Sequence, residues 1–419
     1  MVGLDEILKM AVEKGASDIH LKSGIVPVMR KHGTLRLLSS SLPAITNKQL
    51  EDMVYGIMNQ KQRQIFEEKM DVDISYGLSG AGRFRINVLK QRGTIRVVIR
   101  NIPDRVADIE SLNLPPIVKN IADRERGLVL VTGATGSGKS TTLAAMIDYI
   151  NKNKSKHILM IEDPTEFLIR DKKCIITQRE LGTDTISFAD SLRAALRQDP
   201  DIILIGEMRD KETIEIALLA AETGHLVLST LHTLDTRETI NRILAVFEPH
   251  QQLQVRLQLA SVLCAIVSQR LCRNKAGDGF IPAAEILINN ARISEMIADP
   301  TKTVEIRKAI EESQAAWGMS TFDQSLMDLL SKDLINYEEA LKNSTSPENF
   351  AIRYNGVSHL DGKKWGGGSL IKDRLERAWQ DLATIDLDNT HGNAKRKKHD
   401  EENDSEKGKI NFLKKLKRG

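Results

Sequence analysis

The sequence predicts an α/β protein with a small α+β domain, a parallel sheet flanked by helices, and a helical C-terminal part. In residues 1–103, short segments of alternating apolar and polar residues are separated by glycine turns. From residue 117 on, apolar runs of four to six residues alternate with helical segments, which is typical of buried parallel strands. Between the first of these runs and a helix lies a glycine-rich loop ending in Gly138-Lys139-Ser140, the setting of a phosphate-binding loop.

The composition is that of a globular chain with room for more than one domain. Of its 419 residues, 41% are hydrophobic and 28% charged. No apolar run approaches the ~20 residues needed to span a bilayer. Asp5 and Glu6 interrupt the apolar start, so no signal peptide is expected and the cytoplasm is the expected location. Cys174, Cys264 and Cys272 form no CxxC pair, which predicts that there is no zinc site.

Charge is unevenly distributed. The net charge of +3 is small, so nucleic acid is not an expected partner. The basic character belongs to residues 391–419, and residues 410–418 form a short basic amphipathic segment. Such a segment could touch an anionic membrane surface or a partner, although a solvated tail is the more ordinary interpretation.

Residues 1–103 are predicted to form the first domain, and residues 104–116, rich in proline, a linker. An apolar repeat beginning at Leu4 predicts a helix that ends at Gly15. A second helix is expected at Lys48–Glu67. Strands are expected at Ile19–Leu21, Pro27–Arg30, Leu35–Leu38, Val72–Leu78, Gly82–Gln91 and Gly93–Arg100.

Residues 117–290 are predicted to form the phosphate-binding core. Its strands are expected at Leu128–Thr132, His157–Glu162, Cys174–Thr177, Ile202–Gly206 and Leu226–Thr230, with helices such as Thr183–Gln198 and Lys211–Thr223 between them. Pro249–Cys272 is interpreted as one amphipathic stretch of a helical region, and Ile281–Ile288 as a strand. Ligands of parallel sheets bind at the carboxyl ends of the strands, so the chemistry is expected there.

Residues 291–347 are predicted to form a helical subdomain. Its helices are expected at Ala291–Ala298, Val304–Ala316, Thr321–Lys332 and Tyr337–Asn343. Residues 348–419 are interpreted as a partly disordered tail with an isolated helix at Leu370–Ile385.

The phosphate loop provides the candidate nucleotide-binding residues. They are Gly133, Ala134, Thr135, Gly136, Ser137, Gly138, Lys139, Ser140 and Thr141. The glycines allow successive N–H groups to face a polyphosphate, and the following helix adds the positive end of its dipole. Lys139 is expected to reach the β- and γ-phosphates and Ser140 to hold Mg²⁺. The strand before the loop and the helix after it disfavour a plain glycine turn.

Carboxylates and histidines follow the other predicted strands. Glu162-Asp163-Pro164-Thr165-Glu166 and Gly206-Glu207 each follow a strand, which suits Mg²⁺ coordination and water activation. A solvated acidic turn is the alternative. His225 and His232 flank a third strand, where structural roles and sensing of the γ-phosphate both remain open.

The first domain contributes a row of arginines. The alternation in Gly93–Arg100 places Arg96 and Arg100 on one face of a strand, and Arg85 lies on the preceding strand. An exposed basic face is the ordinary explanation. A guanidinium brought to the phosphate loop would instead stabilise the charge that develops during phosphoryl transfer.

The order of these motifs resembles the secretion ATPase superfamily of type II secretion and type IV pili. The phosphate loop and the segments Ala16–Leu21, Glu162–Glu166, Arg193–Asp201, Gly206–Asp210 and Thr223–Thr233 carry the resemblance. It implies an N-terminal PAS-like domain joined to a RecA-like ATPase domain with a helical C-terminal part. It also implies a homo-hexamer that works at the cytoplasmic face of the inner membrane against a pilus platform protein.

The resemblance also implies residue roles in ATP hydrolysis with Mg²⁺. Glu166 matches the catalytic glutamate and Glu207 the metal-associated glutamate, which with Ser140 would hold Mg²⁺. His225 and His232 match the family's histidine box, and Arg85 and Arg100 match first-domain arginines that reach the γ-phosphate.

Without a four-cysteine metal insert, the chain is most similar to the pilus retraction, or twitching-motility, branch. Retraction members carry a helix with the pattern Ala-Ile-Arg-Asn-Leu-Ile-Arg-Glu, and here Ser294 and Ala298 replace its arginines. With the tail, this resembles accessory retraction ATPases that work beside a second retraction ATPase. The alternatives are a pilus-extension or type II secretion ATPase, a nucleic-acid translocase, and a non-catalytic regulatory subunit.

Overall fold

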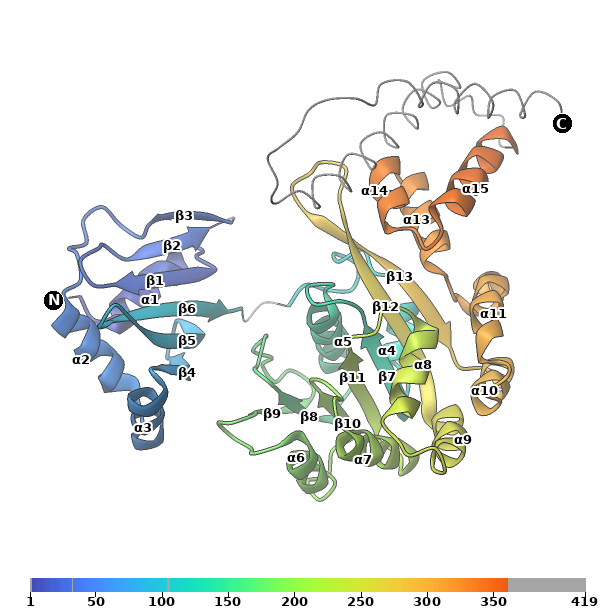
Figure 1. Ribbon diagram of the computed structural model, residues 1–419, viewed down its shortest axis with the longest axis horizontal. Helices are drawn as coiled ribbons and strands as arrows, with labels where there is room; N and C mark the ends of the chain where they lie inside the picture. The colour runs from blue at the N-terminus through green and yellow to red at the C-terminus, as the bar shows by residue number, and fades with distance from the viewer. Residues whose placement is uncertain (1, 32, 104–105, 361–419) are drawn as a thin grey trace, which may run out of the picture. The chain divides into compact units, whose positions relative to one another are not determined.

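The computed structural model describes residues 2–31, 33–103 and 106–360 of the chain (Figure 1). The helix predicted at 370–385 and the basic segment at 410–418 lie outside the described residues. Within the described ranges, no helix has both the length and the apolar character that a membrane span requires.

The N-terminal part is an antiparallel sheet of six strands with three helices. The strands are β1 Asp18–Lys22, β2 Val28–Lys31, β3 Thr34–Leu37, β4 Asp71–Leu78, β5 Gly82–Gln91 and β6 Thr94–Ile102, in the order β3-β2-β1-β6-β5-β4. The helices are α1 Leu4–Glu13, α2 Asn47–Ile57 and α3 Gln60–Lys69. Inward residues alternate with outward ones along β5 and β6, so Phe84, Ile86 and Ile99 join the helices in one core.

The single helix expected at Lys48–Glu67 is wrong, since α2 ends at Ile57 and α3 begins at Gln60. The side chain of Asn59 accepts a hydrogen bond from the Gln62 backbone N–H at 2.8 Å, and the Gln62 side chain accepts one from the Asn59 backbone N–H at 3.0 Å. This reciprocal cap satisfies backbone groups that a new helix leaves free, so Asn59 starts a second helix.

The central part is a seven-stranded sheet in the order β13-β12-β7-β11-β10-β8-β9. Its strands are β7 Gly127–Thr132, β8 His157–Glu162, β9 Ile175–Glu180, β10 Ile202–Ile205, β11 Leu226–Leu231, β12 Leu263–Arg273 and β13 Phe280–Ile288. All neighbouring pairs are parallel except β12 with β13. The apolar runs of β7, β8, β10, β11 and β12 are buried on both faces, which is the environment of a parallel sheet, whereas the edge strand β9 is partly exposed.

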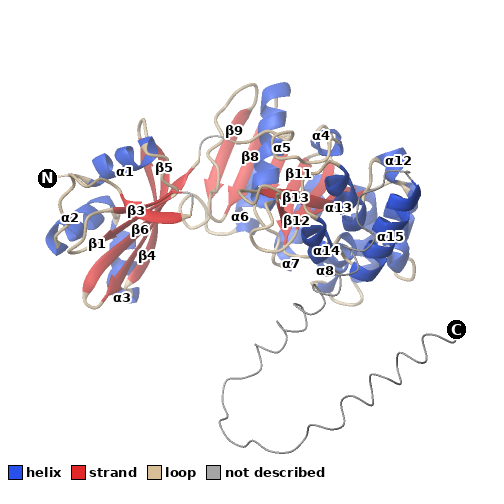
Figure 2. Cartoon of the chain, turned by 90° about the horizontal axis from the view of Figure 1, so that it is seen from above, coloured by secondary structure: helices blue, strands red, loops and turns tan. Residues whose placement is uncertain are grey.

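The helices α4 Ile117–Ala122, α5 Lys139–Asn153, α6 Phe188–Ala195, α7 Lys211–Glu222, α8 Thr236–Ala245 and α9 Gln252–Val262 accompany this sheet. In the order of the sheet, the connection from β7 to β8 runs toward the β9 edge, whereas the connections to β10 and then to β11 run back toward β7. Right-handed crossovers therefore place α5 on one face and α6 and α7 on the other (Figure 2). Helix α6 is shorter than the predicted Thr183–Gln198, because Ser187 caps it by accepting from the Asp190 N–H.

The helical interpretation of Pro249–Cys272 is wrong in its second half. Helix α9 ends at Val262, and β12 begins at Leu263 and pairs in parallel with β7. Ala265, Ile266 and Val267 are buried on both faces of the sheet. A continuous apolar run fits a helix or a doubly buried strand equally well, and only the neighbouring strand decides between them.

The C-terminal helices follow this sheet in the chain, and those up to residue 343 lie on its β12–β13 side (Figure 1). They are α10 Ala291–Ala298, the 3-10 helix η1 Thr303–Glu305, α11 Ile306–Glu312, α12 Gln314–Trp317, α13 Phe322–Ser331, α14 Tyr337–Asn343 and α15 Pro347–Leu360. The single helix expected at Val304–Ala316 is thus three short pieces. Phe322 and Phe350 pack with Cys272 and Ile281 of the two strands, so the start of the expected tail is anchored in this core.

Candidate active site

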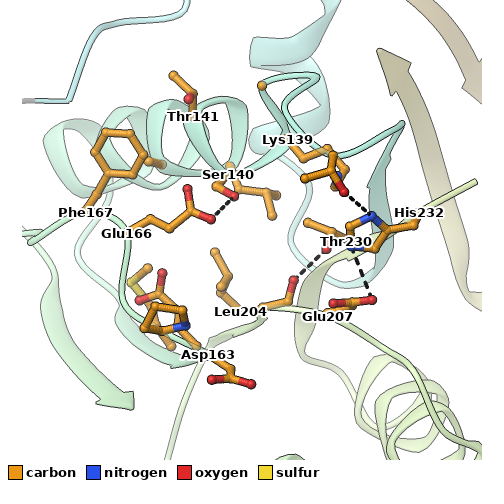
Figure 3. A pocket seen from close by; sticks show the side chains of 18 of the residues that line it. Lys139, Ser140, Thr141, Asp163, Glu166, Phe167, Leu204, Glu207, Thr230 and His232 are labelled. Carbon is orange, nitrogen blue, oxygen red and sulfur yellow. Dashed lines mark hydrogen bonds and ion pairs between the residues drawn. The ribbon is translucent and has the colours of Figure 1, made fainter. Parts of the chain in front are cut away.

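A cavity of about 430 Å³ opens where β8, β10 and β11 end. The register pairs Ile161 with Ile205 and Leu231 with Thr132, so the carboxyl ends of these strands meet at one edge of the sheet. The predicted site residues that line the cavity are Thr135, Gly136, Gly138, Lys139, Ser140, Thr141, Glu166, Glu207 and His232 (Figure 3).

The loop between β7 and α5 needs glycine for two different reasons. Gly133 has φ +143°, and a Cβ there would lie 2.5 Å from both Gln269 O and Ser137 Oγ. Gly136 and Gly138 have φ values of +80° and +89°, but a Cβ on Gly136 would meet nothing within 4 Å. Close packing therefore fixes the first glycine, and backbone conformation alone requires the second.

Lys139 is folded back on the loop. Its Nζ donates to Gly133 O at 3.0 Å and to Ala134 O at 3.1 Å. Burial lowers the pKa of Lys139, and the charges of Glu207 and Glu166 oppose that shift. Two carboxylates therefore face the buried ammonium group.

Ser140 and Glu166 meet across the cavity. Ser140, in the first turn of α5, donates from Oγ to Glu166 Oε1 at 2.8 Å (Figure 3). Glu162, at the end of β8, also lines the cavity and accepts from Gln178 Nε2 at 3.0 Å. Burial is the main cause that raises the pKa of Glu162 to about 7, and the nearby Glu166 charge adds to it.

Glu207 supplies the carboxylate near the tip of β10, one residue after a closely packed glycine. A Cβ on Gly206 would lie 3.3 Å from Glu162 Cα and Ile161 O, both of them backbone atoms. A side chain at position 206 would require these backbone atoms to shift by a few tenths of an ångström. Glu207 pairs with Arg209 Nε at 2.7 Å and with His232 Nε2 at 3.4 Å.

The two histidines lie at opposite ends of β11. His232 follows its carboxyl end, and its Nδ1 lies 3.5 Å from Thr135 Oγ1, so this ring joins the phosphate loop to Glu207. His225 precedes the strand, and its Nδ1 lies 2.9 Å from Ala220 O. Six residues of strand separate the rings by roughly 20 Å. Of the two predicted histidines only His232 lines the cavity, and the role of His225, at the other end of the strand, stays a prediction.

A family model described as "Type II/IV secretion system protein" matches residues 2–316. The chain belongs to this family. It is 46% identical over 347 residues to the "Type IV pilus retractation ATPase PilT" of Pseudomonas aeruginosa, which covers 83% of this chain and 99% of that protein. It is 39% identical over 348 residues to the "Type IV pilus ATPase PilU" of the same organism, which covers 83% and 90%.

A solved structure supports the same assignment. The crystal structure of the pilus retraction motor PilT with bound ADP superposes with a TM-score of 0.76 at 45% identity and covers 83% of this chain and 99% of that one. The α/β fold and the resemblance to secretion ATPases are thereby confirmed.

In this secretion-family chain, Arg85 and Arg100 lie on the N-terminal sheet. They are not among the residues that line the cavity. Arg85 pairs with Asp73 and Arg100 with Asp18, both within that sheet. Their approach to a nucleotide stays a prediction.

Sequence reasoning assigned no role to Arg209, which pairs with Glu207, whereas Glu162 was one of the carboxylates expected at the end of its strand. Arg209 lies two residues after Glu207, within the quoted segment Gly206–Asp210, so its closeness to the strand end was the available signal. Within residues 2–31, 33–103 and 106–360, no group of three or more His, Cys, Asp or Glu side chains forms a metal site on its own.

Proposed function

We propose that this chain is a hexameric ATPase that hydrolyses ATP to power type IV pilus retraction. It works at the cytoplasmic face of the inner membrane against the pilus platform protein. The observation that carries the proposal is that one cavity brings together Lys139, Ser140, Glu166 and Glu207, the set that ATP hydrolysis needs.

The loop and Lys139 bind the phosphates in this proposal. The N–H groups at the start of α5 and the helix dipole favour negative charge at the cavity floor. When ATP binds, Lys139 exchanges its two carbonyl partners for oxygens of the β- and γ-phosphates. Hydrogen bonds from the ammonium group to these charged oxygens are stronger than those to neutral carbonyls and compensate better for its burial.

The donor set of the cavity fits Mg²⁺. A hard cation of this size prefers oxygen ligands and is held by one or two protein groups together with substrate phosphates, so an all-protein cage is not required. Ser140 Oγ and the Glu207 carboxylate would hold the ion, which would neutralise charge on the phosphates. Glu166, within hydrogen-bonding distance of Ser140, orients the attacking water and accepts its proton.

Arg85 and Arg100 complete the proposed site from the N-terminal sheet. A guanidinium that reaches the γ-phosphate stabilises the charge spread over its oxygens in the transition state. Hydrolysis then depends on how the two parts of the subunit approach one another, which is the coupling that a motor requires.

The relatives favour retraction over extension. Both "PilT" and the "Twitching motility protein" of Neisseria gonorrhoeae, which is 45% identical over 326 residues, cover most of this chain. An accessory role beside a second retraction ATPase is the second candidate. Ser294 of α10 donates to Ala260 O at 3.0 Å, so this position contributes a short internal contact where retraction members have an arginine.

Purified full-length protein tests the enzymatic part. The wild type should hydrolyse ATP in Mg²⁺, and Lys139→Ala and Glu207→Ala should abolish turnover. Glu215→Ala, on the exposed part of α7, is the matched control and should retain wild-type rates. Wild-type turnover in either site variant would refute the assignment.

A deletion strain tests the biological part. Abundant pili without twitching support retraction, whereas absence of pili supports extension. If pili retract normally in the deletion strain but purified protein hydrolyses ATP, the accessory role is favoured.

A further inference from the structure

A row of facing residues crosses the N-terminal sheet. The strand register places Arg30 of β2 opposite Asp18 of β1, Asp18 opposite Arg100 of β6, and Arg100 opposite Arg85 of β5. Residues directly opposite one another in a sheet project to the same face. The row therefore alternates in charge from Arg30 to Arg100, but then sets two arginines side by side.

The neighbouring arginines form an unusual pair. Directly opposed Cβ atoms lie about 4.5–5.5 Å apart, and like charges in that position destabilise a sheet. Arg85 has an exposed partner, since its Nη2 lies 3.4 Å from Asp73 Oδ2 and the two side chains are 41% and 53% exposed. Two guanidinium groups so placed are suited to share an anion, and a phosphoryl group is one that both can bind.

Asp18 differs from Asp73 in how firmly it is fixed. Its side chain is 13% exposed, and Oδ1 accepts from Arg100 Nε at 3.1 Å while Oδ2 accepts from Ser17 Oγ at 2.9 Å. The backbone of Ser17 is itself paired on both sides, with its N–H donating to Arg30 O and its carbonyl accepting from Asn101 N. The carboxylate is therefore anchored by neighbouring strands.

The contact with Asp18 leaves the two terminal nitrogens of Arg100 available for another partner. Asp18 engages Nε, while the side chain of Arg100 is 73% exposed. Among the described residues, no hydrogen bond or ion pair engages the terminal Nη1 and Nη2 groups. These two groups make the fork that binds a phosphate through two parallel hydrogen bonds.

We infer that Asp18 is a positioning residue for hydrolysis: it holds Arg100 by Nε so that the terminal fork is presented to the γ-phosphoryl group of ATP. The inference rests on the proposed function, because it requires Arg100 to reach the nucleotide. Asp73 contacts Arg85 differently, because it accepts from the terminal nitrogen Nη2. This contact must break before Arg85 can bind an anion with both terminal nitrogens.

Steady-state kinetics of the full-length assembled protein test the inference. Asp18→Asn keeps the shape of the side chain but removes its charge, and we expect kcat to fall about tenfold with the KM for ATP changed less than about twofold, because orientation and not binding is lost. Asp73→Asn, the same substitution on the same sheet, is the matched control and should not lower kcat.

A double-mutant cycle separates positioning from a structural role. In an Arg100→Ala background, Asp18→Asn should cause no further loss, because there is no guanidinium left to orient. A further tenfold loss in that background, or an unchanged kcat in Asp18→Asn alone, overturns the inference. Ser17→Ala removes the hydroxyl that donates to Asp18 Oδ2 at 2.9 Å and to Arg30 O at 3.2 Å, and leaves the carboxylate of Asp18 in place. It should lower kcat in the same direction by a smaller factor, and it serves if Asp18→Asn does not fold.

The outcomes also separate this inference from the proposed function. A wild type without ATPase activity, or a Lys139→Ala variant with full activity, defeats the proposed function. Normal hydrolysis by the wild type, impaired hydrolysis by Arg100→Ala and full activity in Asp18→Asn defeat only the positioning role.

Discussion

Alanine at Gly133 should destabilise the protein more than alanine at Gly136, although both glycines belong to the same loop. At Gly133 an added Cβ meets Gln269 O and Ser137 Oγ at 2.5 Å, whereas at Gly136 it meets open space. Both positions have positive φ, which costs a non-glycine residue about 1–3 kcal/mol. Overpacking adds about 1–3 kcal/mol at Gly133 only. The expected loss is therefore about 2–6 kcal/mol for Gly133→Ala and about 1–3 kcal/mol for Gly136→Ala.

Thermal unfolding of nucleotide-free protein measures this difference. One kcal/mol corresponds to roughly 2–4 °C in the midpoint for a domain of this size, so Gly133→Ala should lower the midpoint several degrees further than Gly136→Ala. Adding Ser137→Ala to Gly133→Ala removes one of the two close atoms and should recover part of the loss, while the backbone oxygen of Gln269 keeps the rest. A Gly136→Ala variant at least as unstable as Gly133→Ala would contradict the reasoning from packing.

Three further predictions concern the site. Burial raises the pKa of Glu162 from 4.5 to about 7, so the folded protein binds the extra proton and its stability falls as pH rises from 4.5 to 7, by at most about 3 kcal/mol. Glu162→Gln should remove this fall in urea unfolding measured at pH 5 and pH 8, and an unchanged slope would show that the carboxyl titrates normally. Chelating Mg²⁺ should stop turnover, and Ser140→Ala should raise the Mg²⁺ concentration for half-maximal rate by at least about tenfold, a shift that titration of the metal would reveal. Arg85→Ala and Arg100→Ala should reduce hydrolysis while leaving nucleotide affinity, measured with a fluorescent analogue, largely intact, and an equal loss of affinity would indicate a structural role.

Much of the site could be predicted because its parts are local in sequence. The phosphate loop is one continuous segment between a strand and a helix, and the two carboxylates Glu166 and Glu207 each lie in the loop that follows a strand. Parallel strands bring their carboxyl ends to one edge, so the sequence alone was enough to expect these residues in one cavity. In the structure, residues of the phosphate loop line the same cavity as Glu166 and Glu207.

The histidines show where this reasoning stops. His225 and His232 belong to one motif, and the sequence gives no reason to separate them. A strand has a direction, however, and its two ends lie at opposite edges of the sheet. The phosphate loop begins at the edge to which β11 brings His232, so His232 lies beside Glu207 in the cavity, whereas His225 lies beside Ala220 at the other end of the strand.

The amino-acid sequence by itself determined the α/β class, the phosphate loop and the carboxylates that follow the strands, because hydrophobic period and loop chemistry depend on residues close in the chain. Tertiary structure decided that Leu263–Arg273 is a strand, that Arg209 meets Glu207, and that Asp18 holds Arg100. Each of these depends on which strand lies beside which, and hydrogen-bond register between distant segments sets that arrangement, which no local pattern encodes.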